Sequence, residues 1–165
     1  MENRRAALDR LDAMGIAYEL QEHPAVYTIE EMEALGMTLD GETVVKNLFL
    51  RDGKGRRHFL VMVRAEKTVN LKALSALLGV SQLGFASEER LLRYLGLTKG
   101  AVSPLGLLND TGAAVVLVVD ADLVGNPRLG VHPNDNTATV WMTCADIERV
   151  AGENGNEITV VKIAD

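Results

Sequence analysis

Three short stretches of the chain carry residue types at a spacing that could do chemistry. The first is Lys46-Asn47, where a lysine interrupts the apolar, strand-like run 43–50. Burying an unpaired ammonium is costly, so Lys46 either lies on the solvent face of an edge strand or serves a ligand. The exposed edge is the commoner place for a lysine. The other two stretches are the loop Gly100 to Gly106 and Gly130-Val131-His132-Pro133.

The loop from Gly100 to Gly106 is rich in small residues, which would let its backbone approach a ligand closely. The pattern is weak by itself, because glycine and proline mark any turn. Ser103 lacks the surroundings of a nucleophile elbow, which argues against a serine hydrolase. The chain also lacks the Walker and dinucleotide-binding glycine patterns.

His132 could be a ligand, a base or the wall of a pocket, and an ordinary structural histidine is equally consistent with the sequence. The chain has three histidines without metal-ligand spacing and one cysteine, so we expect no metal site. Cys144 stands at a predicted helix start, which could lower the pKa of its thiol. A small, partly buried residue is the simpler interpretation.

Length and composition bound the class of protein. The chain has 165 residues, 47% apolar and 24% charged, which is typical of one globular domain spanning 1–165. We find neither an apolar signal-peptide core nor a run of the ~18 apolar residues that a membrane helix needs, so a cytoplasmic protein with no membrane partner is expected. The net charge of −6 argues against broad nucleic-acid binding and hence DNA. A local basic patch near Lys54, Arg56, Arg57 and His58 is compatible with that charge.

Hydrophobic periodicity and capping residues predict the elements that must position these stretches. Helices are expected over 4–14, Thr28 to Gly36, Asn70 to Gly79 and Ser87 to Gly96, and from Thr143 onward. Strands are expected over 16–20, 43–50, 57–64, 115–119, 137–142 and 158–163, with a short segment over 129–132 and a long loop over 97–112.

The strands 43–50 and 57–64 should pair as a hairpin across the glycine-containing turn 53–55, and 115–119 is the expected central strand. Strands and helices do not alternate regularly. The sequence therefore predicts one α+β domain with a mixed, largely antiparallel sheet surrounded by helices.

Taken together, these residues resemble a known family. Val45-Lys46-Asn47-Leu48-Phe49-Leu50, the Gly-x-x-x-Pro loop Gly100 to Pro104 and Gly130-Val131-His132-Pro133 follow one another as in the YbaK and prolyl-tRNA-synthetase-associated editing domains. Asn134 to Thr139 is similar to the branch of freestanding Ala-tRNA(Pro) deacylases. The resemblance covers nearly the whole chain.

The resemblance implies hydrolysis of the ester that joins a wrong amino acid to tRNA, without a metal or cofactor, assisted by the free hydroxyl of the terminal adenosine. It implies that Lys46 and Gly100 are the catalytic residues. Substrate-binding roles fall on Asn47, Ala101, Val102, Ser103, Pro104 and His132. His132 would limit the size of the pocket, which admits alanine and excludes proline.

The implied partner is the acceptor end of tRNA(Pro), with prolyl-tRNA synthetase or an elongation factor as a further partner. Two alternatives stay open at this point. One is deacylation of Cys-tRNA(Pro) or another aminoacyl-tRNA, as in other branches of the family. The other is a non-catalytic module that binds tRNA or a synthetase.

Overall fold

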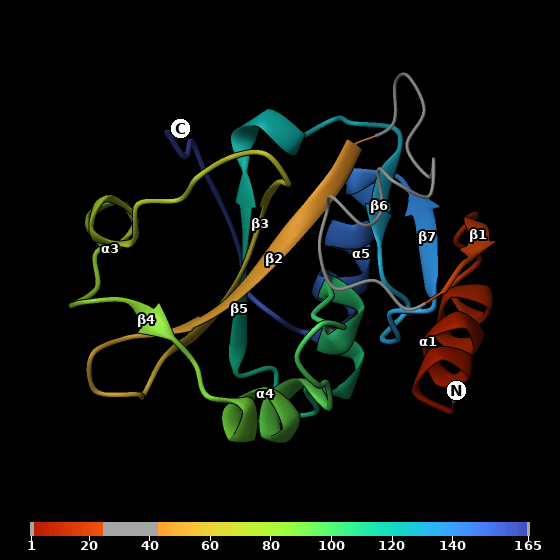
Figure 1. Ribbon diagram of the computed structural model, residues 1–165, viewed down its shortest axis with the longest axis horizontal. Helices are drawn as coiled ribbons and strands as arrows, with labels where there is room; N and C mark the ends of the chain where they lie inside the picture. Colours follow the sequence, from red (N-terminus) through yellow and green to blue (C-terminus); the bar gives the residue numbers. More distant parts are fainter. Residues whose placement is uncertain (1, 25–42, 165) are drawn as a thin grey trace.

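The computed structural model describes residues 2–24 and 43–164 (Figure 1). Its strands form one mixed sheet in the order β1-β7-β6-β2-β3-β5-β8, with β4 paired to β2 off this path. They are β1 (Glu19–Glu22), β2 (Thr43–Arg51), β3 (His58–Arg64), β4 (Gly84–Phe85), β5 (Val115–Asp120), β6 (Leu129–Val131), β7 (Ala138–Met142) and β8 (Ile158–Val161).

The pairings confirm the predicted α+β fold. β2 and β3 form the expected antiparallel hairpin, and β1–β7, β6–β7 and β2–β4 are also antiparallel. β2–β6, β3–β5 and β5–β8 are parallel, which makes the sheet mixed. The run 115–119, expected as the central strand, forms β5 and is flanked on both sides by β3 and β8. The middle of the order is nevertheless β2.

The described helices follow the predicted ones closely, and the helix expected over 4–14 spans 2–13. They are α1 (Glu2–Ala13), α3 (Leu71–Leu78), α4 (Glu88–Leu95) and α5 (Cys144–Asn154), with the 3-10 helices η1 (Pro104–Asn109) and η2 (Ala121–Leu123). Asn70, Ser87 and Thr143 each accept a hydrogen bond from the backbone N–H three residues later, which satisfies a donor at the helix start. The predicted helix from Thr28 to Gly36 lies outside the described residues.

Two predictions were wrong in detail. The strand expected over 16–20 lies instead at β1, because its pairing with β7, from Glu19 opposite Trp141 to Glu22 opposite Ala138, decides its position. The long loop predicted over 97–112 contains η1, where Pro104 begins the turn and the Ser103 hydroxyl accepts from the Leu105 N–H.

Two hydrophobic clusters pack on opposite faces of the hairpin. Val45, Phe49 and Met62 belong to the larger cluster, which α1, α4, α5 and η1 cover. Leu50 and Val63 belong to the smaller cluster, to which α3 contributes. Side chains of a strand alternate between its two faces, so β2 contributes side chains to both clusters and is packed on both faces. No helix among the described residues is long and apolar enough to span a membrane.

A buried ion cluster ties the segment after β3 to η2 and the C-terminal segment. The Lys67 ammonium lies 2.6 Å from Asp120 Oδ2, 2.9 Å from Asp122 Oδ2 and 2.6 Å from the carbonyl oxygen of Ile163. Lys67 is 2% exposed and Asp120 0%. Desolvation lowers the pKa of Lys67, but the two carboxylates outweigh it and hold that pKa above its ordinary value. Lys67 is therefore charged and fully partnered.

We predict that Lys67→Met lowers the free energy of unfolding by about 3–5 kcal/mol, because it leaves the buried Asp120 carboxylate without its cation. Chemical denaturation at neutral pH measures the loss. Arg149→Gln is the control, since Arg149 pairs with Glu153 on the surface of α5 and its loss should cost under ~1 kcal/mol. A Lys67→Met protein as stable as that control would refute the structural role of the cluster.

Candidate active site

Among the described strands, none pairs with one edge of β2 in the middle of its length. β6 pairs with this edge at Thr43 and Val44, and β4 pairs with it at Leu50 and Arg51. Between these pairings, no described strand occupies the edge. The Thr43 N–H donates to Arg128 and the Phe49 carbonyl accepts from Ala86, both on this side. Alternate residues direct their backbone groups to the same edge, so Asn47 presents its N–H and C=O in the gap.

Lys46 and Asn47 point to opposite faces of β2. Asn47 lies opposite Met62 of the larger cluster, and Lys46 opposite Val63 of the smaller one. Cross-strand partners share a face, so the two side chains diverge at the strand. Lys46 is half-buried and forms no ion pair with any described residue. Its four-carbon chain must bend around the open edge for the ammonium to reach the Asn47 side.

The loop 100–104 lies against this edge. The Asn47 amide Nδ2 is 3.5 Å from the Val102 carbonyl oxygen, a long contact, while Asn47 Oδ1 is buried without a partner among the described residues. Gly100 has φ +93°, a conformation that a side chain would strain, which explains glycine at the start of the motif. Ala101 and Pro104 are buried, and Val102 is half-buried.

Ser103 connects this loop to the histidine motif. It is fully buried, and its hydroxyl donates to the His132 carbonyl while accepting from the Leu105 N–H. The buried hydroxyl therefore holds the loop against the histidine motif. The role of Ser103 in substrate binding stays a prediction.

The hydrogen bonds of His132 fix its tautomer. Nδ1 is 3.0 Å from the Ala138 carbonyl oxygen, and a carbonyl can only accept, so Nδ1 carries the proton. Burial is the main cause that lowers the pKa of His132; nearby His23 lowers it further, while the Ala138 carbonyl and Asp135 oppose the shift. The imidazole is therefore neutral at pH 7, and its Nε2 offers a lone pair to a substrate or a water.

His23 is a site residue that sequence reasoning missed. Its ring centroid lies 6.4 Å from that of His132, and its Nε2 is 2.9 Å from the hydroxyl of the buried Thr139. His23 directly follows β1, which pairs with β7 and so brings it beside the histidine motif. One sequence signal existed: His23-Pro24 and His132-Pro133 are the two His-Pro pairs of the chain.

Gly130 allows the histidine motif to lie close to β7. A Cβ at this position would stand 2.7 Å from the Trp141 ring, closer than such atoms approach. Glycine therefore lets β6 pack against Trp141, which is buried on the neighbouring strand. The glycines of both motifs are explained by local geometry.

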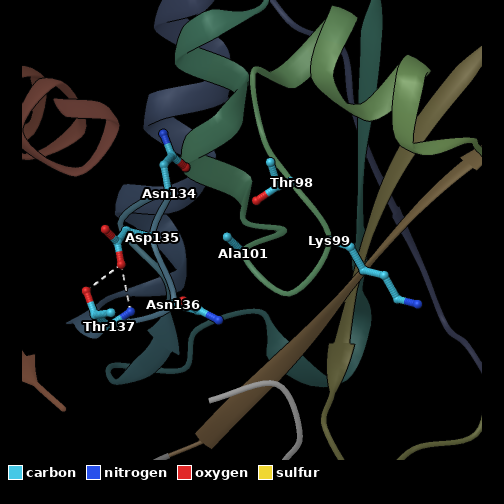
Figure 2. Close-up of a pocket in the computed structure, with 7 residues that line it drawn as sticks. All are labelled: Thr98, Lys99, Ala101, Asn134, Asp135, Asn136 and Thr137. Carbon is cyan, nitrogen blue, oxygen red and sulfur yellow. Dashed lines mark hydrogen bonds between the residues drawn. The ribbon is translucent and has the colours of Figure 1, made fainter. Parts of the chain in front are cut away.

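A groove of about 300 Å³ continues from these residues (Figure 2). Thr98, Lys99 and Ala101 form one wall and residues 134–137 the other. Figure 2 shows the two loops facing each other, with the Lys99 side chain directed away from residues 134–137. Asp135 accepts from the N–H and hydroxyl of Thr137, and these bonds outweigh desolvation and lower its pKa. The walls are mostly polar, so the groove suits a polar ligand.

Asn134 fastens one wall of the groove to the core. Its Nδ2 is 3.2 Å from the Leu105 carbonyl oxygen, and its Oδ1 is buried without a partner in the part of the chain that the structure describes. Its φ of +62° is a conformation that asparagine tolerates better than most residues. The loops on both sides of the groove are thus bonded to η1 or to each other rather than left free.

The surroundings of Cys144 exclude attack by its thiol. Cys144 is buried, and that burial, with Glu148 beside it, raises the pKa of its thiol to about 12, so it is no nucleophile. Among the described residues, no group of three histidine, cysteine, aspartate or glutamate side chains could hold a metal ion. The described residues offer the site backbone groups, the neutral imidazole of His132 and the ammonium of Lys46.

Comparisons with known proteins identify the family. The aminoacyl-tRNA editing domain matches residues 23–150. The chain is 47% identical over 163 residues to prolyl-tRNA editing protein ProX of Acetoanaerobium sticklandii, with 99% of each chain covered. It is 40% identical over 152 residues to prolyl-tRNA synthetase associated domain-containing protein 1 of Danio rerio, covering 91% of this chain and 82% of that protein.

A crystal structure proposed to be that of a trans-editing enzyme for prolyl tRNA synthetase matches with a TM-score of 0.76 and 22% identity, over 100% of this chain and 98% of that one. At that identity the likeness shows the fold alone. The matched domain and the two relatives show that this chain belongs to the aminoacyl-tRNA editing domain family.

Proposed function

We propose that the protein removes alanine from mischarged Ala-tRNA(Pro), acting as one editing domain over residues 1–165. Membership in the editing family makes it an aminoacyl-tRNA deacylase, and the relatives' names direct that activity to prolyl-tRNA. The observation that carries the proposal is the meeting of the loop 100–104, His132 and Asn47 at the open edge of β2.

An aminoacyl ester is already activated, so positioning and polarisation suffice for its hydrolysis. The backbone N–H and C=O of Asn47 and the backbone from Gly100 onward can hold the amino and carbonyl groups of the substrate. The neutral Nε2 of His132 can accept a hydrogen bond from the α-amino group or from the attacking water. The Lys46 ammonium then stabilises negative charge on the carbonyl oxygen or the terminal phosphate.

The proposed selectivity follows from size. Pro104 and Pro133 stiffen the two segments that flank the site, and both are buried. A wall that cannot yield rejects the larger ring of proline more easily than a pocket selects a smaller group. Alanine therefore fits better than the cognate proline. Cys-tRNA(Pro) is the nearest alternative substrate, and prolyl-tRNA synthetase or an elongation factor is the proposed further partner.

We predict that Lys46→Ala lowers the single-turnover rate of Ala-tRNA(Pro) deacylation by about 10²–10³-fold, as for loss of one donor to a developing oxyanion. Circular dichroism should show an unchanged fold, because Lys46 is only half-buried. Lys72→Ala, at an exposed position on α3, is the matched control and should keep the native rate. A folded Lys46→Ala protein that turns over at the native rate would remove Lys46 from the site.

His132→Ala should reduce the ratio of Ala-tRNA(Pro) to Pro-tRNA(Pro) deacylation rates by about tenfold, because the shortened side chain no longer limits the pocket. His132→Asn is the companion variant, because its amide can still donate a hydrogen bond to the Ala138 carbonyl. Comparing the two variants distinguishes the effect of losing this hydrogen bond from the effect of losing the bulk of the side chain. Unchanged rates and an unchanged ratio in His132→Ala would make His132 a structural residue.

Deacylation should survive chelation, because the described residues offer no set of metal ligands. The measurement is the rate of Ala-tRNA(Pro) hydrolysis before and after dialysis against EDTA, in a buffer free of divalent ions except those required to fold the tRNA. A complete loss of activity that added zinc restores would contradict the proposed chemistry.

A further inference from the structure

The charge of this acidic protein is unevenly distributed. The β2–β3 turn, α4 and the segment after it carry seven cations: Arg51, Lys54, Arg56, Arg57, Arg90, Arg93 and Lys99, which we call the basic track. Only Asp52, Glu88 and Glu89 oppose them in these segments, giving a net charge of +4, whereas the whole chain carries −6. A cluster against the overall sign marks a surface for an anion.

The carboxylate nearest to the turn does not neutralise the track. Asp52 Oδ1 accepts from the backbone N–H groups of Arg56 at 2.9 Å and Arg57 at 3.3 Å. The carboxylate thus bonds to backbone groups of the turn, and its charge is already included in the net +4, while the side chains of Arg56 and Arg57 are exposed. The Arg57 guanidinium lies 5.1 Å over the Phe59 ring, and that of Arg93 lies 5.4 Å over Tyr94.

Arg90 joins the turn to α4. Its Nη1 donates to the Gly55 carbonyl at 2.9 Å and lies 3.0 Å from Nε2 of the buried His58. Burial, followed by the charge of Arg90, lowers the pKa of His58, so the ring stays neutral and accepts from the guanidinium. The contact fixes the start of α4 against the turn.

The track leads from the turn to the candidate active site. α4 has 8 residues, about 12 Å at 1.5 Å per residue, and its end continues directly into Thr98 and Lys99 on the groove wall. In Figure 1, α4 lies between the β2–β3 turn and η1, which follows the loop 100–104. The cations of the basic track therefore extend from the groove to the β2–β3 turn. A polyanion with one end in the groove could contact them along its length.

We propose that the basic track binds the phosphate backbone of the tRNA acceptor stem and directs its aminoacylated end into the groove. The proposal rests on the proposed function for the identity of the RNA. Arginine suits phosphate because its guanidinium offers several donors in a fixed plane. Phosphate contacts position a nucleic acid without reading its sequence. The track therefore supplies affinity and orientation, and the chemistry stays at the open edge of β2.

The test uses a fluorescent acceptor-stem microhelix of tRNA(Pro) that carries no amino acid. Its binding is measured by fluorescence anisotropy at about 50–200 mM KCl. Arg56→Gln/Arg57→Gln should bind more weakly at low salt, with a log–log salt slope shallower by about two, one unit for each lost phosphate contact. The turn survives because Asp52 bonds to backbone groups that the substitutions leave in place. Thermal unfolding checks this.

Lys72→Gln/Lys162→Gln removes the same charge at two exposed lysines outside the track and should keep the native slope. If the Arg56/Arg57 variant binds with the native affinity and slope, or if both double variants lose equally, the track is not an RNA surface. An acidic protein partner would give that unchanged result. A microhelix without an amino acid cannot be deacylated, so its binding is independent of the proposed activity. A protein that binds RNA through the basic track but hydrolyses no aminoacyl-tRNA would refute only the proposed function.

Discussion

The site depends on one constraint, the interruption of pairing along one edge of β2. This strand lies in the middle of the sheet, yet β6 leaves it after Val44 and β4 meets it only at Leu50. No described strand therefore pairs with the backbone groups of Asn47, at a position where β3 and hydrophobic clusters on both faces hold β2 rigid. A site built on such a strand is positioned more accurately than one built on loops alone.

The loops that complete the site are held by individual bonds to that frame. The Ser103 hydroxyl joins the Gly-x-x-x-Pro loop to the His132 carbonyl, and Asn134 joins the following loop to η1. Sheet pairing through β1 and β7 brings His23 beside His132. Two buried oxygens, Asn47 Oδ1 and Asn134 Oδ1, have no hydrogen-bond partner within residues 2–24 and 43–164. Such groups are tolerated at functional sites more often than elsewhere.

Local signals were enough for much of the fold. The β2–β3 hairpin and the caps at Asn70, Ser87 and Thr143 follow from neighbouring residues and were predicted correctly. Features that depend on residues far apart in the sequence were not predicted. Pairing with β7 determines the position of β1, and the Lys67 cluster depends on Asp120. The same limit applied to the site. Periodicity located Lys46 and Asn47 on a strand, but only the register shows that their side chains diverge and that His23 joins the site.

We propose that a rigid pocket at this edge of β2 accepts alanine and rejects proline. Its most direct measurement is the deacylation rate of the unaltered protein on tRNA(Pro) charged with alanine, cysteine, serine and proline in parallel. The account predicts the fastest hydrolysis for alanine and no hydrolysis above the uncatalysed rate for proline. Faster hydrolysis of the cysteine ester would instead support the alternative function, deacylation of Cys-tRNA(Pro). Equal hydrolysis of alanine and proline, or of neither, would contradict the size-limited editing site.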